Sequence, residues 1–290
     1  MKPRKLDVYI VAKAYSGSTV LGRDLNNHSK IFYAGELGRI SDYRKKYDYY
    51  EYDAECMNCL INGTSCKIFS KDNLKKIGKK HPRQANEYLR KITKKPIIVD
   101  GSKYVNWLNI NCEDLNYLEN TRVIMLVKSP IEYLYSCSVR GVEPIWAEAN
   151  AWRDTYIDAI RTVNRLGLSS MVVRFDEYQK NPQHMLKQIC SYLGVDYQPS
   201  MLQSSNKPLH AIGGNPGAYE SIVGKKLLKE HAINSEQKLF DINPNRINST
   251  LKKTKISKKQ REDYLQILCD TPMLLDVANT LGFSKKDIFN

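Results

Sequence analysis

The sequence predicts an α/β fold in which a parallel sheet is covered by helices on both faces. Three observations indicate it: short apolar runs rich in β-branched residues, helical periodicity between them, and a small-residue loop after the first run. The apolar runs lie at residues 8–11, 31–34, 96–100, 122–127 and 170–175. Because these runs are nearly continuous rather than alternating, they are typical of parallel strands that are buried on both faces.

The segments between the strands carry the helical pattern. Apolar residues recur at helical spacing and predict helices over residues 20–27, from about 131, over 147–166, over 182–193 and as a closing pair over 258–281. Residues 40–95 are polar and rich in Tyr and Lys, and we expect them to form the helices and loops of an insert or lid. We therefore expect one domain over residues 1–290, with that insert at about 40–95.

The first strand leads directly into Ser16-Gly17-Ser18-Thr19, and an amphipathic segment follows. A strand, a tight turn and a helix N-terminus together expose backbone N–H groups and the positive end of a helix dipole, which favours a bound phosphate. A plain structural turn is the alternative. The Walker pattern of two glycines followed by Lys and Ser or Thr is absent, which disfavours a nucleoside-triphosphate kinase or a GTPase.

A second polar constellation follows the strand at 122–127. Lys128 ends that strand, and Ser136 stands eight residues later, about 9 Å along a helix that begins after Pro130. One phosphate reaches both side chains only if the chain folds back between them. Loops that follow parallel strands meet at the carboxyl edge of the sheet, so we expect four loops to lie there together, namely those after Val11, Ala34, Val99 and Val127.

The composition favours an anionic ligand. Forty-five Lys and Arg residues against 31 Asp and Glu give a net charge of +14, although many lysines fall in short runs typical of solvated surface. Residues 273–289 faintly resemble a helix-turn-helix, but their lysines form no recognition face, so we expect no nucleic-acid partner. No N-terminal signal and no apolar run near the ~18 residues of a membrane span is present. We expect a soluble, cytoplasmic chain; no oligomeric state is indicated.

Taken together, the motifs resemble those of the sulfotransferases that use 3′-phosphoadenosine 5′-phosphosulfate (PAPS). The resemblance rests on Ser16-Gly17-Ser18-Thr19 after the first strand, and on Lys128 with Ser136, followed by Arg140. It continues from about residue 8 to the C-terminus in order and spacing. The further matches are Gly35-Glu36-Leu37, Asp100-Gly101-Ser102-Lys103, Val173-Arg174-Phe175-Asp176-Glu177-Tyr178 with Asn181-Pro182, and His210-Ala211-Ile212-Gly213-Gly214-Asn215.

The resemblance implies a three-layer, P-loop-like fold and transfer of a sulfuryl group from PAPS to a hydroxyl or amine of a carbohydrate, lipid or small metabolite. The product nucleotide would be adenosine 3′,5′-bisphosphate (PAP). Glu36 would act as the general base, and Lys103 would neutralise charge on the transferred group. The residues implied to bind the nucleotide are Tyr15, Ser16, Gly17, Ser18, Thr19, Lys128, Ser136, Gly214 and Asn215.

Three departures from the family pattern keep alternatives open. Tyr15 stands where many members have Lys or Arg, so that Lys13 or Lys103 would supply the charge. Lys128 stands where Arg is usual, and residues 215–219 lack the Arg that many relatives have soon after the Asn. A protein that binds PAPS or PAP without transferring sulfate is therefore the main alternative. Three of the residues also have a purely structural interpretation. Glu36 could bind a helix N-terminus or a basic neighbour, and Lys103 could pair with Asp100. Phe175 could pack in the core rather than on the adenine.

Cys56, Cys59 and Cys66 lie within the insert, and together they look like a feature of a bacterial branch of the family. The spacing of the first two suits zinc, but no fourth ligand is apparent nearby, with His81 the possible one. A disulfide is not expected in a cytosolic chain. We therefore expect free or loosely packed thiols and no bound metal.

Overall fold

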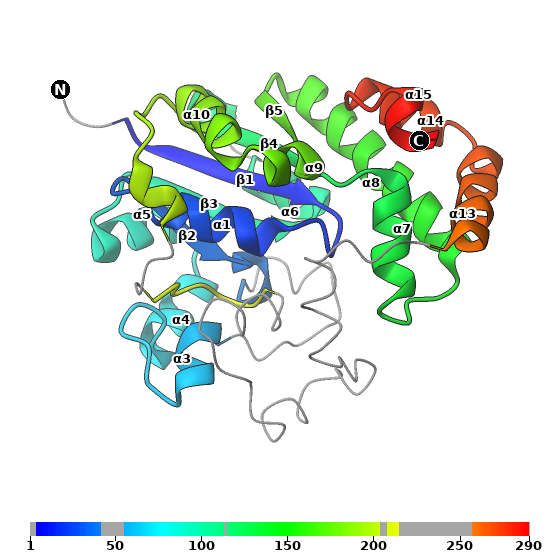
Figure 1. Cartoon of the computed structure of the whole chain (residues 1–290). Coiled ribbons are helices and arrows are strands. Elements are labelled where there is room, and N and C mark those ends of the chain that lie inside the picture. Colours follow the sequence, from blue (N-terminus) through cyan, green and yellow to red (C-terminus); the bar gives the residue numbers. More distant parts are fainter. Residues whose placement is uncertain (1–3, 42–54, 113–114, 204–207, 215–256, 290) are drawn as a thin grey trace.

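A five-stranded parallel sheet forms the centre of the molecule. The computed structural model describes residues 4–41, 55–112, 115–203, 208–214 and 257–289. Its strands lie in the order β2-β3-β1-β4-β5, so that β1 is central (Figure 1). The strands are β1 Leu6–Ala12, β2 Ile31–Gly35, β3 Ile97–Lys103, β4 Thr121–Val127 and β5 Ser169–Arg174. Each of the five predicted strands is present, and the predicted α/β class with a parallel sheet is confirmed.

Helices occupy most of the remaining described chain. The helices are α1 Ser18–Asn26, α3 Met57–Asn62, α4 Lys71–Gly78, α5 Pro82–Thr93, α6 Val105–Asn111, α7 Pro130–Ser138, α8 Ile145–Leu166, α9 Phe175–Lys180, α10 Pro182–Leu193, α13 Lys258–Asp270, α14 Leu274–Thr280 and α15 Lys285–Phe289. Short 3₁₀ helices lie at η1 Leu37–Arg39, η2 Leu115–Asn120 and η3 Pro199–Leu202. Among these helices, none combines the length and apolarity that a bilayer span demands.

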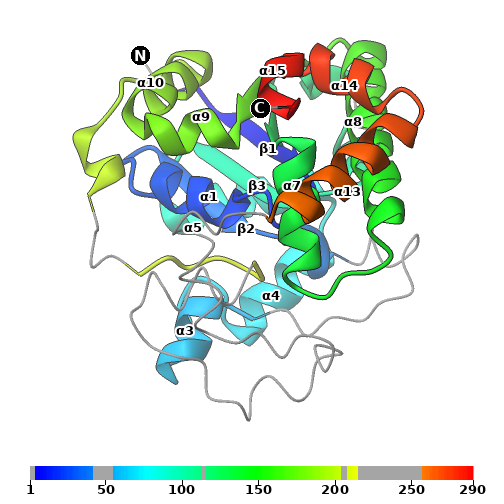
Figure 2. The same ribbon diagram turned by 45° about the vertical axis from the view of Figure 1, so that its right-hand side comes forward.

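The helices form two layers, because successive strand residues face opposite sides of the sheet. Val8 and Ile10 pack in a core beneath α1 and α10, whereas Tyr9 and Val11 pack in a second core beneath α7, α8, α13 and α14. Figure 2 shows α1, α9 and α10 on one side of the sheet and α7, α8, α13 and α14 on the other. The chain is therefore a three-layer α/β structure.

Strand register brings the predicted loops to one edge. Val11 pairs with Lys103, Ala12 with Leu126, and Val127 with Arg174, so that β1, β3, β4 and β5 end nearly level. The turn after β1, Lys103 at the end of β3 and the residue after β4 consequently share the carboxyl edge of the sheet. This is the edge where ligands bind in open parallel sheets.

Most helix boundaries agree with the sequence pattern, with small differences. The helix predicted at 182–193 is α10, which begins at Pro182 and ends before Gly194. The strand predicted at 170–175 ends one residue early, because Phe175 already begins α9. The predicted insert holds α3, α4 and α5 in its described part, while residues 42–54 lie outside the described residues.

The C-terminal helices close the core rather than forming a separate module. Leu274, Val277 and Phe283 are buried in the same core as α7 and α8. Helix α15 is five residues long, and Arg174 stacks its guanidinium 4.2 Å from the centre of the Phe283 ring. These packing contacts explain the apolar pattern of residues 273–289.

Candidate active site at the carboxyl edge of the sheet

The turn between β1 and α1 adopts a backbone that few residues tolerate. Tyr15 and Gly17 have φ angles of 64° and 89°, and a Cβ on Gly17 would lie 2.0 Å from the Phe175 ring. Glycine at residue 17 therefore allows the turn to pass directly under that ring. Lys103 at the end of β3 also has a positive φ of 71°. Strained non-glycine residues of this kind cluster at functional sites.

The N-terminus of α1 carries no acidic residue of its own. Its first turn holds no Asp or Glu, and no side chain among the described residues caps the helix. Ser16 is fully buried, and its side chain lies beside the Tyr156 hydroxyl. Ser18 and Thr19 are buried as well. Buried hydroxyls beside a helix N-terminus whose first turn holds no acidic residue form an arrangement that favours a bound anion.

Lys128 and Ser136 are brought together by the start of α7. Lys128 Nζ donates to Ser136 Oγ at 2.9 Å, and Trp152 Nε1 donates to the Lys128 carbonyl at 3.1 Å. Burial lowers the pKa of Lys128 to about 8; Glu132 nearby opposes this shift, and Arg140 adds to it. The chain thus folds back between the two predicted phosphate ligands, as joint binding of one phosphate requires.

Two aromatic rings connect this cation to the first turn. The Phe175 ring that packs on Gly17 has Lys128 Nζ 5.6 Å from its centre. The Arg140 guanidinium lies 4.6 Å from the centre of the Tyr15 ring. The two motifs, more than a hundred residues apart in sequence, consequently form one contiguous basic site. Phe175 is buried against Tyr178 in the core, as its structural interpretation expects, and its ring also lies beside Lys128.

Glu36 and Lys103, the two predicted catalytic residues, contact each other. Glu36 follows β2, is 3% exposed, and forms ion pairs with Lys103 and, at 2.5 Å, with Arg39. Burial alone would raise the pKa of Glu36, but Lys103 and then Arg39 outweigh it and hold the pKa below its usual value. Glu36 is therefore ionised at neutral pH, and it is a weaker base than a free carboxylate.

Asp100 is occupied by neighbours other than Lys103. Its carboxylate accepts hydrogen bonds from the Ser102 backbone at 2.8 Å and from Trp107 Nε1 at 2.6 Å. Burial raises the pKa of Asp100 to about 6, although these hydrogen bonds counteract the shift. Ser102 Oγ in turn accepts from the Gly38 backbone at 2.8 Å. This network fixes the end of β3 beside η1, and hence Lys103 beside Glu36.

A short segment from late in the chain completes the edge. Residues 208–214 run beside β2, where the Ile212 carbonyl accepts from the Glu36 backbone at 2.7 Å. A Cβ on Gly35 would lie 2.2 Å from that carbonyl, and one on Gly213 would lie 2.9 Å from Arg39. Gly214 ends the segment next to this contact, and Asn215 lies outside the described residues.

The cysteines of the insert gather around a histidine that sequence reasoning did not connect with them. Cys56, Cys59 and Cys66 lie next to His210, whereas His81, the ligand considered from the sequence, is not part of the group. Sequence reasoning also missed Arg39 as a partner of Glu36. The available signal for that contact was the Gly35-Glu36 pair followed three residues later by a cation.

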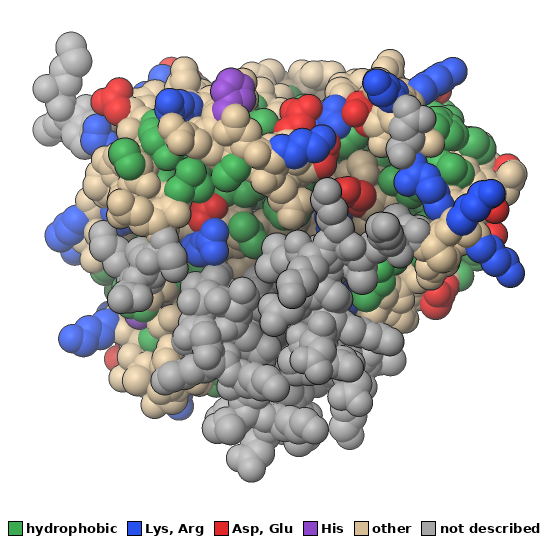
Figure 3. All heavy atoms as spheres, in the orientation of Figure 1, with side chains coloured by type: hydrophobic (Ala, Val, Ile, Leu, Met, Phe, Trp, Pro, Cys, Tyr) green, Lys and Arg blue, Asp and Glu red, His purple; other side chains and the backbone are tan. Residues whose placement is uncertain are grey.

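The surface seen in Figure 3 shows Lys and Arg side chains spread among other types rather than gathered in one patch. Lys128 and Lys103 differ from these surface cations, since each is partly buried and has polar or charged partners within the fold. The candidate site therefore depends on a few enclosed charges rather than on the large net charge.

Comparison with known proteins identifies the fold. No protein-family model and no curated protein matches this chain. Among solved structures, the sulfotransferase domain of the olefin synthase from Synechococcus PCC 7002 is 14% identical, with a TM-score of 0.52 over 98% of each chain. Mouse sulfotransferase SULT7A1 in complex with PAP is 13% identical, with a TM-score of 0.48 over 96% of this chain and 88% of that one. The first similarity shows that this chain has the sulfotransferase fold.

Proposed function

We propose that the chain is a sulfotransferase that takes a sulfuryl group from PAPS and passes it to a hydroxyl or amine. The observation that carries the proposal is the meeting of two anion-binding features, the turn at Ser16–Thr19 and the pair of Lys128 with Ser136, at one edge of the sheet. Each motif is identified from the sequence separately, and the similarity to a sulfotransferase fold supports the proposal that both bind one nucleotide.

In this proposal the nucleotide spans the two motifs. Backbone N–H groups at Ser16–Thr19 hold the 5′-phosphosulfate, helped by the α1 dipole and the Ser16 hydroxyl. Lys128, Ser136 and Arg140 hold the 3′-phosphate, and the Phe175 ring lies beside them for the adenine. Burial raises the pKa of Tyr15, although Arg140 nearby opposes the shift. Tyr15 therefore stays protonated at neutral pH and can donate a hydrogen bond.

Sulfuryl transfer needs positioning and charge stabilisation more than covalent chemistry from the protein. Lys103 is the cation at the transferred group, and the ion pair with Glu36 holds it there. While this ion pair is intact, Glu36 acts as a positioning residue for Lys103. To accept a proton from the acceptor, Glu36 must first separate from Lys103. The acceptor is a small molecule or glycan whose hydroxyl or amine reaches this edge.

Calorimetric titration with PAP tests the nucleotide site. Lys128→Ala should weaken binding about tenfold or more, because a lost hydrogen bond to a charged group is worth about 1.5–3 kcal/mol. Lys5→Ala is the matched control, since Lys5 is an exposed lysine that pairs with Glu87 before β1 begins. A folded wild-type chain that binds no PAP would refute the proposal.

A nucleotide-binding protein without transfer activity is the second candidate, favoured by Tyr15 in place of a cation. PAP release from PAPS in the presence of hydroxyl or amine acceptors distinguishes the two. Release that requires both an acceptor and Lys103 supports transfer. Tight PAP binding without release across carbohydrate, lipid and small-metabolite acceptors supports the second candidate.

A further inference from the structure

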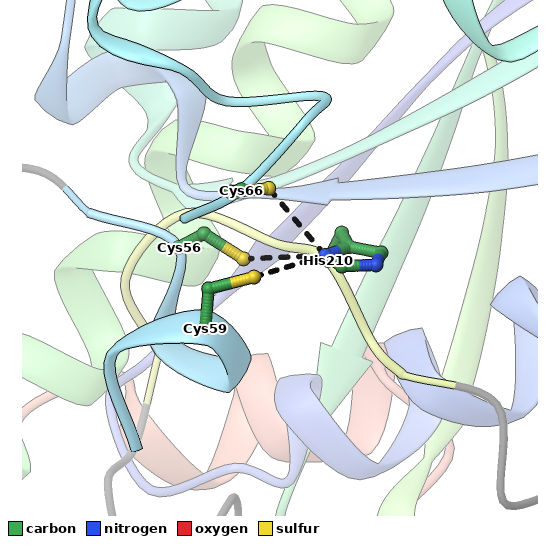
Figure 4. Close-up of side chains that lie close together, drawn as sticks. All are labelled: Cys56, Cys59, Cys66 and His210. Atoms are coloured by element: carbon green, nitrogen blue, oxygen red, sulfur yellow. Dashed lines mark hydrogen bonds between the residues drawn. The ribbon is translucent and has the colours of Figure 1, made fainter. Parts of the chain in front are cut away.

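Three thiols surround a single imidazole nitrogen in the insert. Figure 4 shows Cys56, Cys59 and Cys66 directed at the ring of His210. Their Sγ atoms lie 3.6, 3.4 and 3.4 Å from Nδ1, and the four atoms lie within 4.8 Å of one another. All three cysteines are buried. Such a group is a concentrated set of soft ligands with little access to water.

Hydrogen bonding does not account for this arrangement. An imidazole Nδ1 carries either one proton or one lone pair, so it makes one good hydrogen bond and not three. In a tetrahedral zinc site, Zn–S bonds of about 2.3 Å and a Zn–N bond of about 2.0–2.1 Å place sulfur and nitrogen about 3.5–3.6 Å apart. The observed separations of 3.4–3.6 Å match that geometry.

We propose that Cys56, Cys59, Cys66 and His210 bind one Zn²⁺ ion. Three thiolates and one imidazole form one of the standard closed, four-coordinate sets of structural zinc sites. The Cys56-x2-Cys59 spacing at the start of α3 supplies two ligands from one turn. The Phe69 backbone N–H donates to Cys66 Sγ at 3.3 Å, the kind of outer contact that orients a metal-bound thiolate. This assignment replaces the expectation of free thiols.

The ion joins parts of the chain that are far apart in sequence. Cys56, Cys59 and Cys66 belong to the insert, and His210 belongs to the segment 208–214. Two residues beyond His210, Ile212 pairs with Gly35 at the end of β2 and also with Cys56. Zinc would therefore clamp the insert and the late segment together against the strand that carries Glu36. Because a preformed site is absent from the unfolded chain, its binding energy becomes folding energy.

Metal analysis of the full-length chain, purified with its thiols reduced and without added metal, tests the assignment directly. About one zinc per chain is expected, with X-ray absorption showing three sulfur neighbours and one nitrogen at the bond lengths of a tetrahedral site. His210→Ala and Cys59→Ser should each lower the bound zinc at least about tenfold. Cys269→Ser, in which an exposed cysteine of α13 is changed, should retain it. A wild-type chain that holds no zinc and takes up no Co²⁺ overturns the proposal.

Thiol alkylation of the wild-type protein avoids variants that fail to fold. With the metal in place, Cys269 should react and the three insert cysteines should not. A strong chelator should expose Cys56, Cys59 and Cys66, while the deeply buried Cys137 reports whether the whole domain has unfolded. Equal labelling of the insert cysteines with and without chelator overturns the site. A disulfide between two of them, released only by a reductant, overturns it too. Neither outcome depends on sulfuryl transfer.

Discussion

The partly buried charge of Lys128 makes nucleotide binding dependent on pH in a predictable direction. Burial lowers the pKa of Lys128 to about 8 in the free protein, and a bound 3′-phosphate requires the charged form. Raising the pH from 7 to 9 takes the protonated fraction from about 0.9 to about 0.1, so PAP should bind about tenfold more weakly, a change of ~1.4 kcal/mol. Asp100, with a pKa of about 6, completes its titration below this interval.

The assay is calorimetric titration of PAP at several pH values in two buffers of different ionisation enthalpy. Near pH 8, binding should take up about half a proton per nucleotide, because half of the Lys128 side chains are neutral before binding. Lys128→Arg is the matched control, since a guanidinium stays charged throughout. Its affinity should hardly change over the same interval. An equally steep pH dependence in wild type and Lys128→Arg would refute the reasoning.

Three further predictions concern stability. Gly17→Ala should lower the free energy of unfolding in chemical denaturation by about 2 kcal/mol or more, because the added Cβ stands on a left-handed backbone and clashes with an aromatic ring. Gly63→Ala is the control: Gly63 also has a positive φ but faces open space, so this variant should lose only about 1 kcal/mol. Glu36→Gln should destabilise by about 3 kcal/mol at pH 7 by leaving Lys103 unpaired. Because the folded pKa of Glu36 lies below its usual value, the ionised carboxylate stabilises the fold above the unfolded pKa, and the difference in Tm should shrink as the pH falls below 4. Lys128→Met should raise Tm at pH 7 while weakening PAP binding about tenfold or more. The gain in Tm should fade as the pH rises through 8 towards the unfolded pKa, and an unchanged Tm at every pH would contradict the cost assigned to the charge of Lys128.

The strands and their common edge could be predicted because local pattern determines them. The run at 122–127 is apolar throughout, and Pro130 fixes where α7 begins, so Lys128 could be placed at the carboxyl end of a strand from the sequence. The same reasoning placed α10 between Pro182 and Gly194. In each of these cases the deciding residues lie within one element or next to it.

The remaining features depend on contacts between distant segments. His210 joins cysteines at least 144 residues away, and no periodicity reports that meeting. The pairing of Glu36 with Lys103 follows from the register between β2, β3 and β1, which the apolar pattern leaves undetermined. Phe175 was assigned to a strand because it continues an apolar run, and its place beside Lys128 emerges only from packing.

The central position of β1 has a consequence for how the chain is made. Leu6 pairs with Ile97 and Asp7 with Thr121, so β1, the first strand of this sheet to be synthesised, obtains both neighbours only after β4 has left the ribosome. Until then at least one edge of this apolar, β-branched strand is unpaired, which is a condition under which nascent chains aggregate or recruit chaperones. Pairing over such sequence separations is also slow, because the entropy of closing the loop is lost before the stabilising contacts form. The turn after β1 is thus translated before the other elements of the candidate site and acquires its shape late.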